Sequence, residues 1–118
     1  MKKNIHRSGQ VAETVRQVLG EALIQEIRDP RVGRVTITAV TVTPDLSRAR
    51  VRVIAGDGME SDQVLEGLRS AAGFLRTKVA KVLTTRVAPE IVFELDRGQE
   101  HAARIDQLLA SLREGEEV

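Results

Sequence analysis

The residues of this 118-residue sequence whose types and spacing could do chemistry are its arginines and lysines. Arg48, Arg50 and Arg52 alternate with apolar residues, so on a β-strand their guanidinium groups would line one face about 7 Å apart. Forked N–H donors in such a row match the oxygens of a phosphate backbone. The predicted RNA-binding candidates are Lys2, Lys3, Arg7, Arg48, Arg50, Arg52, Arg76, Lys78, Lys81 and Arg86. The alternative is a solvated strand face whose arginines form salt bridges with Glu90 or Glu94.

The charge of the chain is unevenly distributed, although its formal net charge is only +1. Residues 1–89 hold 15 Lys and Arg against 9 Asp and Glu, a net charge of +6. Residues 90–118 hold 3 against 8, a net charge of −5. A basic body with an acidic end favours an anionic partner for the body, and an ordinary mixed surface is the alternative.

Aromatic residues limit how such a surface could recognise RNA. The chain has two phenylalanines and neither tyrosine nor tryptophan. Phe74 and Phe93 both fall in apolar patterns, which predicts that they lie in the core. Without an aromatic platform for base stacking, recognition would depend on shape and phosphates, and it would be salt-sensitive and weakly sequence-selective.

Nothing in the sequence indicates catalysis. His6 and His101 are isolated, cysteine is absent, and neither a P-loop nor a G-x-G-x-x-G motif is present. Glu94 and Asp96 stand two residues apart, and a charged outer strand face explains them without acid–base chemistry. We therefore predict no catalytic residue, no metal site and no cofactor, and an RNA hydrolase is the weakest hypothesis. With no signal peptide and no long apolar run, a cytoplasmic monomer that does not enter a membrane is expected.

The elements that must position these residues follow from hydrophobic periodicity. Apolar spacings of three and four predict helices over 8–28, from Ser61 or Asp62 to Leu83, and over 99–113. Alternation and β-branched residues predict strands over 34–43, 48–54 and 91–96. The first two strands form an antiparallel hairpin, and a phase slip near Ala39 indicates a β-bulge or burial of both faces. Residues 114–118 are predicted to be a frayed acidic tail after a single domain over 1–113.

This order predicts a two-layer α+β fold, because three strands must bury their apolar face against helices. The third strand follows a helical crossover, so it could run parallel to a strand of the hairpin. With the helices on one face of the sheet, the face that carries the three arginines would be open to solvent.

Gly73 lies in the middle of the long amphipathic stretch "EGLRSAAGFLRTKVAKVL", where glycine costs roughly 1 kcal/mol relative to alanine. The surrounding "SAAGFLR", together with "IRDPRVGRVTITAVTVTPDLSRARVRV" and "RVAPEIVFELD", resembles bacterial ribosome-binding factor A over nearly the whole chain. The resemblance implies a type II KH-like domain with Ala-x-Gly in place of G-x-x-G, here Ala71, Ala72 and Gly73. Gly73 would then mark a kink between two helices. Close packing of the helix on the sheet is the alternative.

The resemblance also implies a function. It implies assembly of the small ribosomal subunit, late maturation of its 16S rRNA including the 5′ end, and importance in cold adaptation. The implied partners are the free small subunit, its rRNA and other assembly factors. The factor would act by binding, without a cofactor or catalytic residue. A KH-fold protein-interaction adaptor and a general RNA-binding protein are the alternatives.

Overall fold

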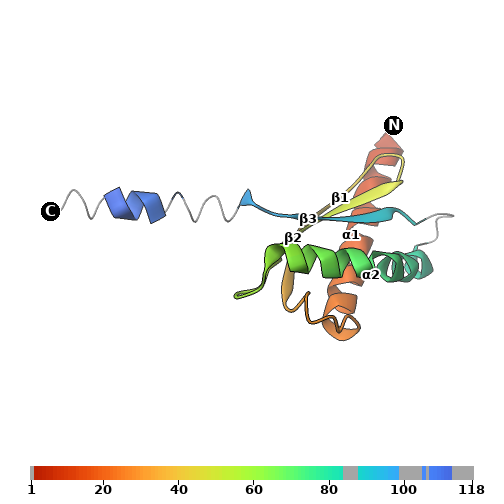
Figure 1. Cartoon of the computed structure of the whole chain (residues 1–118). Coiled ribbons are helices and arrows are strands. Elements are labelled where there is room, and N and C mark those ends of the chain that lie inside the picture. The colour runs from red at the N-terminus through yellow and green to blue at the C-terminus, as the bar shows by residue number, and fades with distance from the viewer. Residues whose placement is uncertain (1, 84–87, 99–104, 106, 113–118) are drawn as a thin grey trace.

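The computed structural model describes residues 2–83, 88–98, 105 and 107–112 (Figure 1). Residues 105 and 107–112 are helical. The other elements are α1 (Lys2–Gln25), β1 (Val35–Val42), β2 (Arg48–Ala55), α2 (Ser61–Val82) and β3 (Glu90–Leu95). None of the helices in these ranges is long and apolar enough to cross a membrane.

The three strands form one mixed sheet in the order β1-β2-β3. The central strand, β2, is antiparallel to β1 and parallel to β3, which confirms the predicted hairpin and the predicted parallel strand. The register shifts between Ile37 and Ala39, so the phase slip near Ala39 is a bulge. Val35 of β1 lies opposite Ala55, and Leu95 of β3 lies beside Val53. The start of β1 and the ends of β2 and β3 therefore meet at the same end of the sheet.

The core lies between one face of this sheet and the two long helices. In β2 the buried residues alternate with the arginines, and Ala49, Val51 and Val53 are fully inaccessible to solvent. They belong to one cluster with apolar residues of α1, α2 and β3, namely Val15, Leu19, Leu68, Leu75, Val79 and Phe93. The predicted two-layer α+β fold is confirmed. The apolar residues spaced by three and four on the helices pack against the alternating apolar residues of the strands.

The turn between α1 and β1 is held by a local network. The Asp29 carboxylate accepts hydrogen bonds from the backbone N–H of Arg31 at 2.9 Å and from its guanidinium at 2.6–3.1 Å. Arg31 also lies 3.3 Å from the Glu66 carboxylate of α2. This network inserts Val32, which is 1% exposed, against α2. A Cβ added to Gly67 would lie 2.8 Å from Val32 Cγ2, so Gly67 is the glycine that permits close packing.

The first helix is longer at its N-terminus than its apolar pattern predicted. It begins at Lys2 rather than Ser8 and ends at Gln25 rather than Arg28. No proline interrupts residues 2–8, and the helix runs through Asn4 and Ser8. Lys2 and Lys3 therefore lie in the first turn of α1, and not ahead of it.

Gly73 does not separate two helices, because α2 is continuous from Ser61 to Val82. Glu60 occupies the N-cap of α2, and its side chain makes no capping hydrogen bond. A Cβ added to Gly73 would meet nothing within 4 Å, so the alternative of close packing on the sheet is wrong. A bend within the continuous helix remains a prediction. The Thr77 hydroxyl donates to the Gly73 carbonyl at 3.1 Å, a bond of the kind that often bends helices.

The predicted C-terminal helix is described only in part, and its apolar side chains do not pack on the sheet. Ile105, Leu108, Leu109 and Leu112 are 43–65% exposed. Figure 1 shows this helix away from the body of the domain, so of the described helices only α1 and α2 cover the sheet. The predicted tail, 114–118, lies outside the described residues.

Candidate RNA-binding surface

The outer face of β2 presents the predicted row of arginines. Arg48, Arg50 and Arg52 point away from the core, and their side chains are 51%, 56% and 58% exposed. Two-residue spacing on a strand places them on one face, while Ala49, Val51 and Val53 fill the other. The prediction that this face is open is confirmed for the described residues.

The same arginines form long ion pairs with β3, so the alternative predicted from the sequence is also observed. Arg48 lies 3.7 Å from Glu90, and Arg50 and Arg52 lie 3.6 Å and 4.0 Å from Glu94. The parallel register, which places Arg48 beside Glu90 and Arg52 beside Glu94, causes this pairing. Exposed pairs of this kind contribute about 0–1 kcal/mol. The glutamates therefore orient the arginines but hold them weakly enough for a phosphate to compete.

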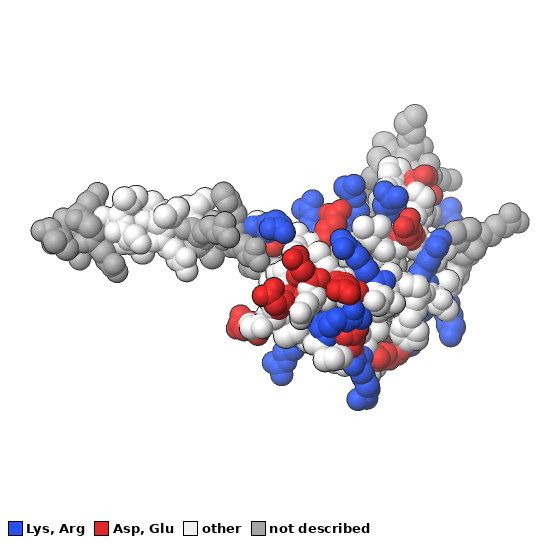
Figure 2. Space-filling model, in the orientation of Figure 1, with Lys and Arg blue, Asp and Glu red and all other residues white. Residues whose placement is uncertain are grey.

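Asp96 adds negative charge at the end of this face. Its carboxylate accepts a hydrogen bond from the Gly98 N–H at 3.0 Å. Its pKa lies below the ordinary value because of the Thr38 hydroxyl first, and then the Gly98 N–H, with Arg52 contributing through its charge. With Glu90 and Glu94, three carboxylates thus share the face with three arginines. Figure 2 likewise shows acidic and basic side chains interspersed on the body of the domain.

Two of the predicted basic residues on α2 are already engaged within the fold. The Arg76 guanidinium donates two hydrogen bonds to the Ala88 carbonyl, at 3.2 Å and 3.0 Å, which joins α2 to the segment before β3. Lys78 pairs with Glu26, and its ammonium group lies 5.6 Å from the centre of the Phe74 ring. Replacing these residues would therefore disturb packing as well as any RNA contact.

The basic residues left for a ligand on α2 are Lys81 and Arg69. Both are exposed, and neither forms an ion pair with a described residue. Arg69 is not among the predicted candidates, although it lies on the polar side of the same helix. Arg7 is exposed on α1, and Lys2 and Lys3 share its N-terminal turns, where the helix dipole favours an anion. Arg86 lies outside the described residues.

The two phenylalanines differ, and one prediction about them is wrong. Phe93 is 1% exposed and lies in the core, as expected. Phe74 is 47% exposed, because it is one position away from the buried stripe through Leu68, Leu75 and Val79. It lies beside Gly73, whose missing side chain leaves open space. An aromatic ring is therefore available on α2, contrary to the expectation drawn from composition.

The predicted residues do not form one surface. The arginines of β2 face away from the helices, whereas α2 packs on the opposite face of the sheet. A rigid RNA surface could contact one group directly and the other only around an edge of the sheet. The candidate surface is thus divided into two patches, the arginine face of β2 and the exposed sides of α2, on which Arg69 lies about 120–140° around the helix from Phe74 and Lys81.

The residues that the structure describes form no metal site. No cluster of three or more His, Asp or Glu residues in these ranges could hold a metal ion. Hydrogen bonds from Arg31 lower the pKa of Asp29 to about 2, and those from Thr43 and Ser47 lower that of Asp45 to about 2. Such carboxylates stay ionised at neutral pH and stabilise turns.

Comparison with known proteins gives a consistent result. The family model described as Ribosome-binding factor A matches residues 7–109. A Desulfitobacterium hafniense protein named Ribosome-binding factor A is 43% identical over 113 residues, which cover 95% of this chain and 90% of that protein.

Solved structures agree in fold. The solution structure of a Thermotoga maritima protein is 38% identical, with a TM-score of 0.66, and the match covers 75% of this chain and 85% of that one. A homology model of Thermus thermophilus ribosome binding factor A, fitted into a cryo-EM map of its 30S complex, is 25% identical. Its TM-score is 0.58, and the match covers 79% of this chain and 94% of that one.

Proposed function

Because the chain belongs to the ribosome-binding factor A family, we propose that it binds the small ribosomal subunit through ribosomal RNA. The family match over residues 7–109 is the observation that carries this proposal. The 30S complex of the Thermus thermophilus relative supports the choice of partner. The exposed arginines of β2 and the exposed cations of α2 supply groups that can bind phosphates.

The protein acts by binding, and not by catalysis. A protein that binds one conformation of a folding RNA more tightly than another shifts the population toward it by the difference in affinity. We propose that this shift promotes late maturation of 16S rRNA, including processing of its 5′ end. Misfolded RNA lives longer in the cold, so the effect would matter most during cold adaptation. The site of action would be the cytoplasm, where a monomer would work beside other assembly factors.

The open sheet face does not favour the alternative of a protein-interaction adaptor. Its outward residues on β2 are three exposed arginines and the half-buried Ile54, which do not form an apolar patch. Charged, half-exposed groups suit the polar and salt-sensitive contacts of RNA better than the apolar centre of a protein interface.

Co-sedimentation with purified small subunits tests the proposal. In the variant R48Q/R50Q/R52Q we expect at least about tenfold weaker binding and a salt dependence reduced by up to about three phosphate contacts. The matched variant E90Q/E94Q removes the competing carboxylates from the same face, so it should bind more tightly. If both variants bind as the parent does at every salt concentration, the β2 face is not the contact.

A second comparison separates the two patches. R69Q/K81Q changes only exposed cations of α2, whereas an R76A variant would also break the two bonds to Ala88. We expect R69Q/K81Q to weaken binding without changing the unfolding midpoint.

A deletion strain grown in the cold should accumulate 16S precursor with an uncut 5′ end. Normal rRNA in that strain would contradict the proposed role in maturation.

A further inference from the structure

Five of the seven large apolar side chains that are exposed in the described residues belong to two separate surfaces. One is Ile24, which is 85% exposed at the end of α1. The others are Ile105, Leu108, Leu109 and Leu112 of the C-terminal helix (residues 105 and 107–112). Burial of apolar surface stabilises a protein by about 25 cal/mol per Å², and side chains that remain in water do not contribute this stabilisation. Each surface therefore lacks a partner in the described structure.

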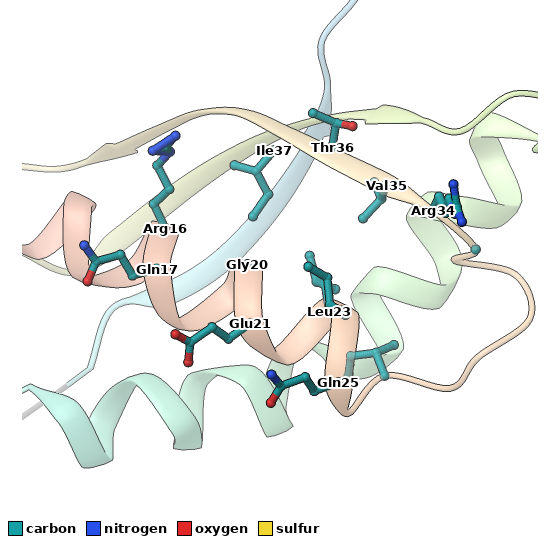
Figure 3. A pocket seen from close by; sticks show the side chains of 13 residues that line it. Arg16, Gln17, Gly20, Glu21, Leu23, Gln25, Arg34, Val35, Thr36 and Ile37 are labelled. Atoms are coloured by element: carbon teal, nitrogen blue, oxygen red, sulfur yellow. The ribbon is translucent and has the colours of Figure 1, made fainter.

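Ile24 borders a groove between α1 and the first half of β1, here called the α1–β1 groove. The volume of this groove is about 950 Å³. Its apolar lining includes Leu23, Ile24, Ile27, Val35 and Ile37. Figure 3 shows Val35 and Ile37 pointing from β1 toward Leu23 of α1. β1 is an edge strand of the sheet, so the groove also runs along an unpaired strand edge.

The C-terminal helix carries the pattern of a packed helix without being packed. Its apolar residues stand at positions i, i+3, i+4 and i+7, which places them on one face. The radius of gyration of the Cα atoms is 17.6 Å, whereas a compact domain of this length has about 13–14 Å. The difference reflects the helix that extends from the body in Figure 1.

The sheet topology places the end of β3, which precedes this helix in the chain, close to the groove. Leu95 ends β3 beside Val53, and Val53 lies opposite Ile37 in the groove. The edge strands are two strand spacings apart, or about 10 Å. The eight residues from Arg97 to Arg104 can span up to about 26 Å, so the chain between β3 and the helix is long enough.

Charge also favours this pairing over a random apolar contact. Arg16 and Arg34 lie at opposite ends of the groove, with one carboxylate, Glu21, between them (Figure 3). Residues 105–118 contain one arginine against four acidic residues. An amphipathic helix within an acidic stretch of sequence thus complements an apolar groove with a basic rim.

We propose that the C-terminal helix of this chain docks in the α1–β1 groove with its Ile105, Leu108, Leu109 and Leu112 face inward. Docking buries both exposed apolar surfaces in one step. It also covers the free edge of β1, which would otherwise be a template for pairing with another chain. The occupant is the chain's own helix, and the tests below distinguish it from a second copy.

Disulfide trapping tests the proposal, because the chain has no cysteine of its own. E21C/S111C places one thiol on the groove rim and one beside the apolar face of the helix. The control T41C/S111C places the first thiol on the exposed outer face of β1, toward its other end. Under mild oxidation at low protein concentration we expect E21C/S111C to form a disulfide within one chain at least about tenfold faster than the control. Adding I24E or L109E to E21C/S111C should slow its disulfide formation to the rate of the control. An amide NMR spectrum of each variant checks that the domain is folded.

Each other result overturns the proposal. Equal trapping of the two pairs would show random collision, and disulfides between chains would show that the groove receives a second copy. X-ray scattering of the unmodified protein gives an independent answer without any variant. A radius of gyration near 14 Å is expected for the docked form, and a value near 17.6 Å would show that the helix stays extended.

Discussion

The turn after α1 and the outer face of β2 both carry arginines, but the fold uses them differently. Arg31 makes three side-chain hydrogen bonds to Asp29 and also approaches Glu66, so its donors serve the junction between α1, β1 and α2. Arg48, Arg50 and Arg52 are more than half exposed and meet their glutamates only at 3.6–4.0 Å. A basic residue is available to a ligand where its own fold leaves the donors incompletely paired. Charge in the sequence alone does not show this difference.

The two glycines of α2 differ in the same way. Gly67 lies against Val32 at the junction, where a Cβ has no room. Gly73, six residues later, faces open space beside exposed Phe74. The first glycine is required by packing, and the second has no packing reason in the described structure. Gly73 lowers the stability of the helix and no packing contact requires it, so it is a candidate for close approach by a ligand.

The largest expected effect distinguishes two neighbouring residues of α2. Leu75 is fully buried, so Leu75→Ala should lower the free energy of unfolding by about 2–5 kcal/mol. Phe74 is 47% exposed, and Phe74→Ala should cost less than about 1 kcal/mol. Urea denaturation measures both. Equal losses would mean that Phe74 is a core residue after all, whereas weaker subunit binding by Phe74→Ala alone would indicate stacking on an RNA base.

Alanine at each glycine sharpens the comparison further. Gly67→Ala gains about 1 kcal/mol of helix propensity but forces a Cβ to 2.8 Å from Val32, and overpacking costs about 1–3 kcal/mol, so a net loss is expected. Gly73→Ala meets no atom within 4 Å and should raise stability by about 1 kcal/mol. The measurement is the urea midpoint of each variant. If Gly73→Ala destabilises the protein, a bend at this residue is needed for folding itself.

Subunit binding by the same variant tests the function of Gly73. A Gly73→Ala protein that is more stable yet binds small subunits more weakly would show that the open space is used by RNA. The control is Ala80→Ser, a small change at an exposed position of the same helix. Unchanged binding by both would leave Gly73 without a role on this surface.

Unfolding at acidic pH tests the Asp29 and Asp45 carboxylates, which accept hydrogen bonds within their turns. The pKa of Asp29 and of Asp45 is lowered from 3.8 to about 2 in the folded protein. A lowered pKa contributes stability that is fully present above about pH 4 and is lost as pH falls toward 2. Asp45→Asn should therefore flatten the dependence of the unfolding midpoint on pH between 4 and 2. Asp57→Asn, at an exposed loop aspartate, is the control and should leave that slope as it is.

Much of the fold could be predicted from the sequence because its periodicity is strong. The alternation through Ala49, Val51 and Val53 predicted the strand over residues 48–54 and its open face. Long-range pairing could not be predicted in the same way. Glu26 with Lys78 and Ala88 with Arg76 are 52 and 12 residues apart, and they meet only through packing. Phe74 was misplaced because a shift of one position on a helix turns a side chain by about 100°.

The smallest expected effect concerns the ion pairs of the open face. A double-mutant cycle with Arg50→Ala and Glu94→Ala should give a coupling free energy of about 0.2–1 kcal/mol, since both side chains are partly exposed and 3.6 Å apart. Each single variant should change stability by no more than about 0.5 kcal/mol. A coupling well above 1 kcal/mol would mean that Glu94 holds Arg50 as firmly as Asp29 holds Arg31. The arginines of β2 would then be structural, and the two regions compared above would not differ in kind.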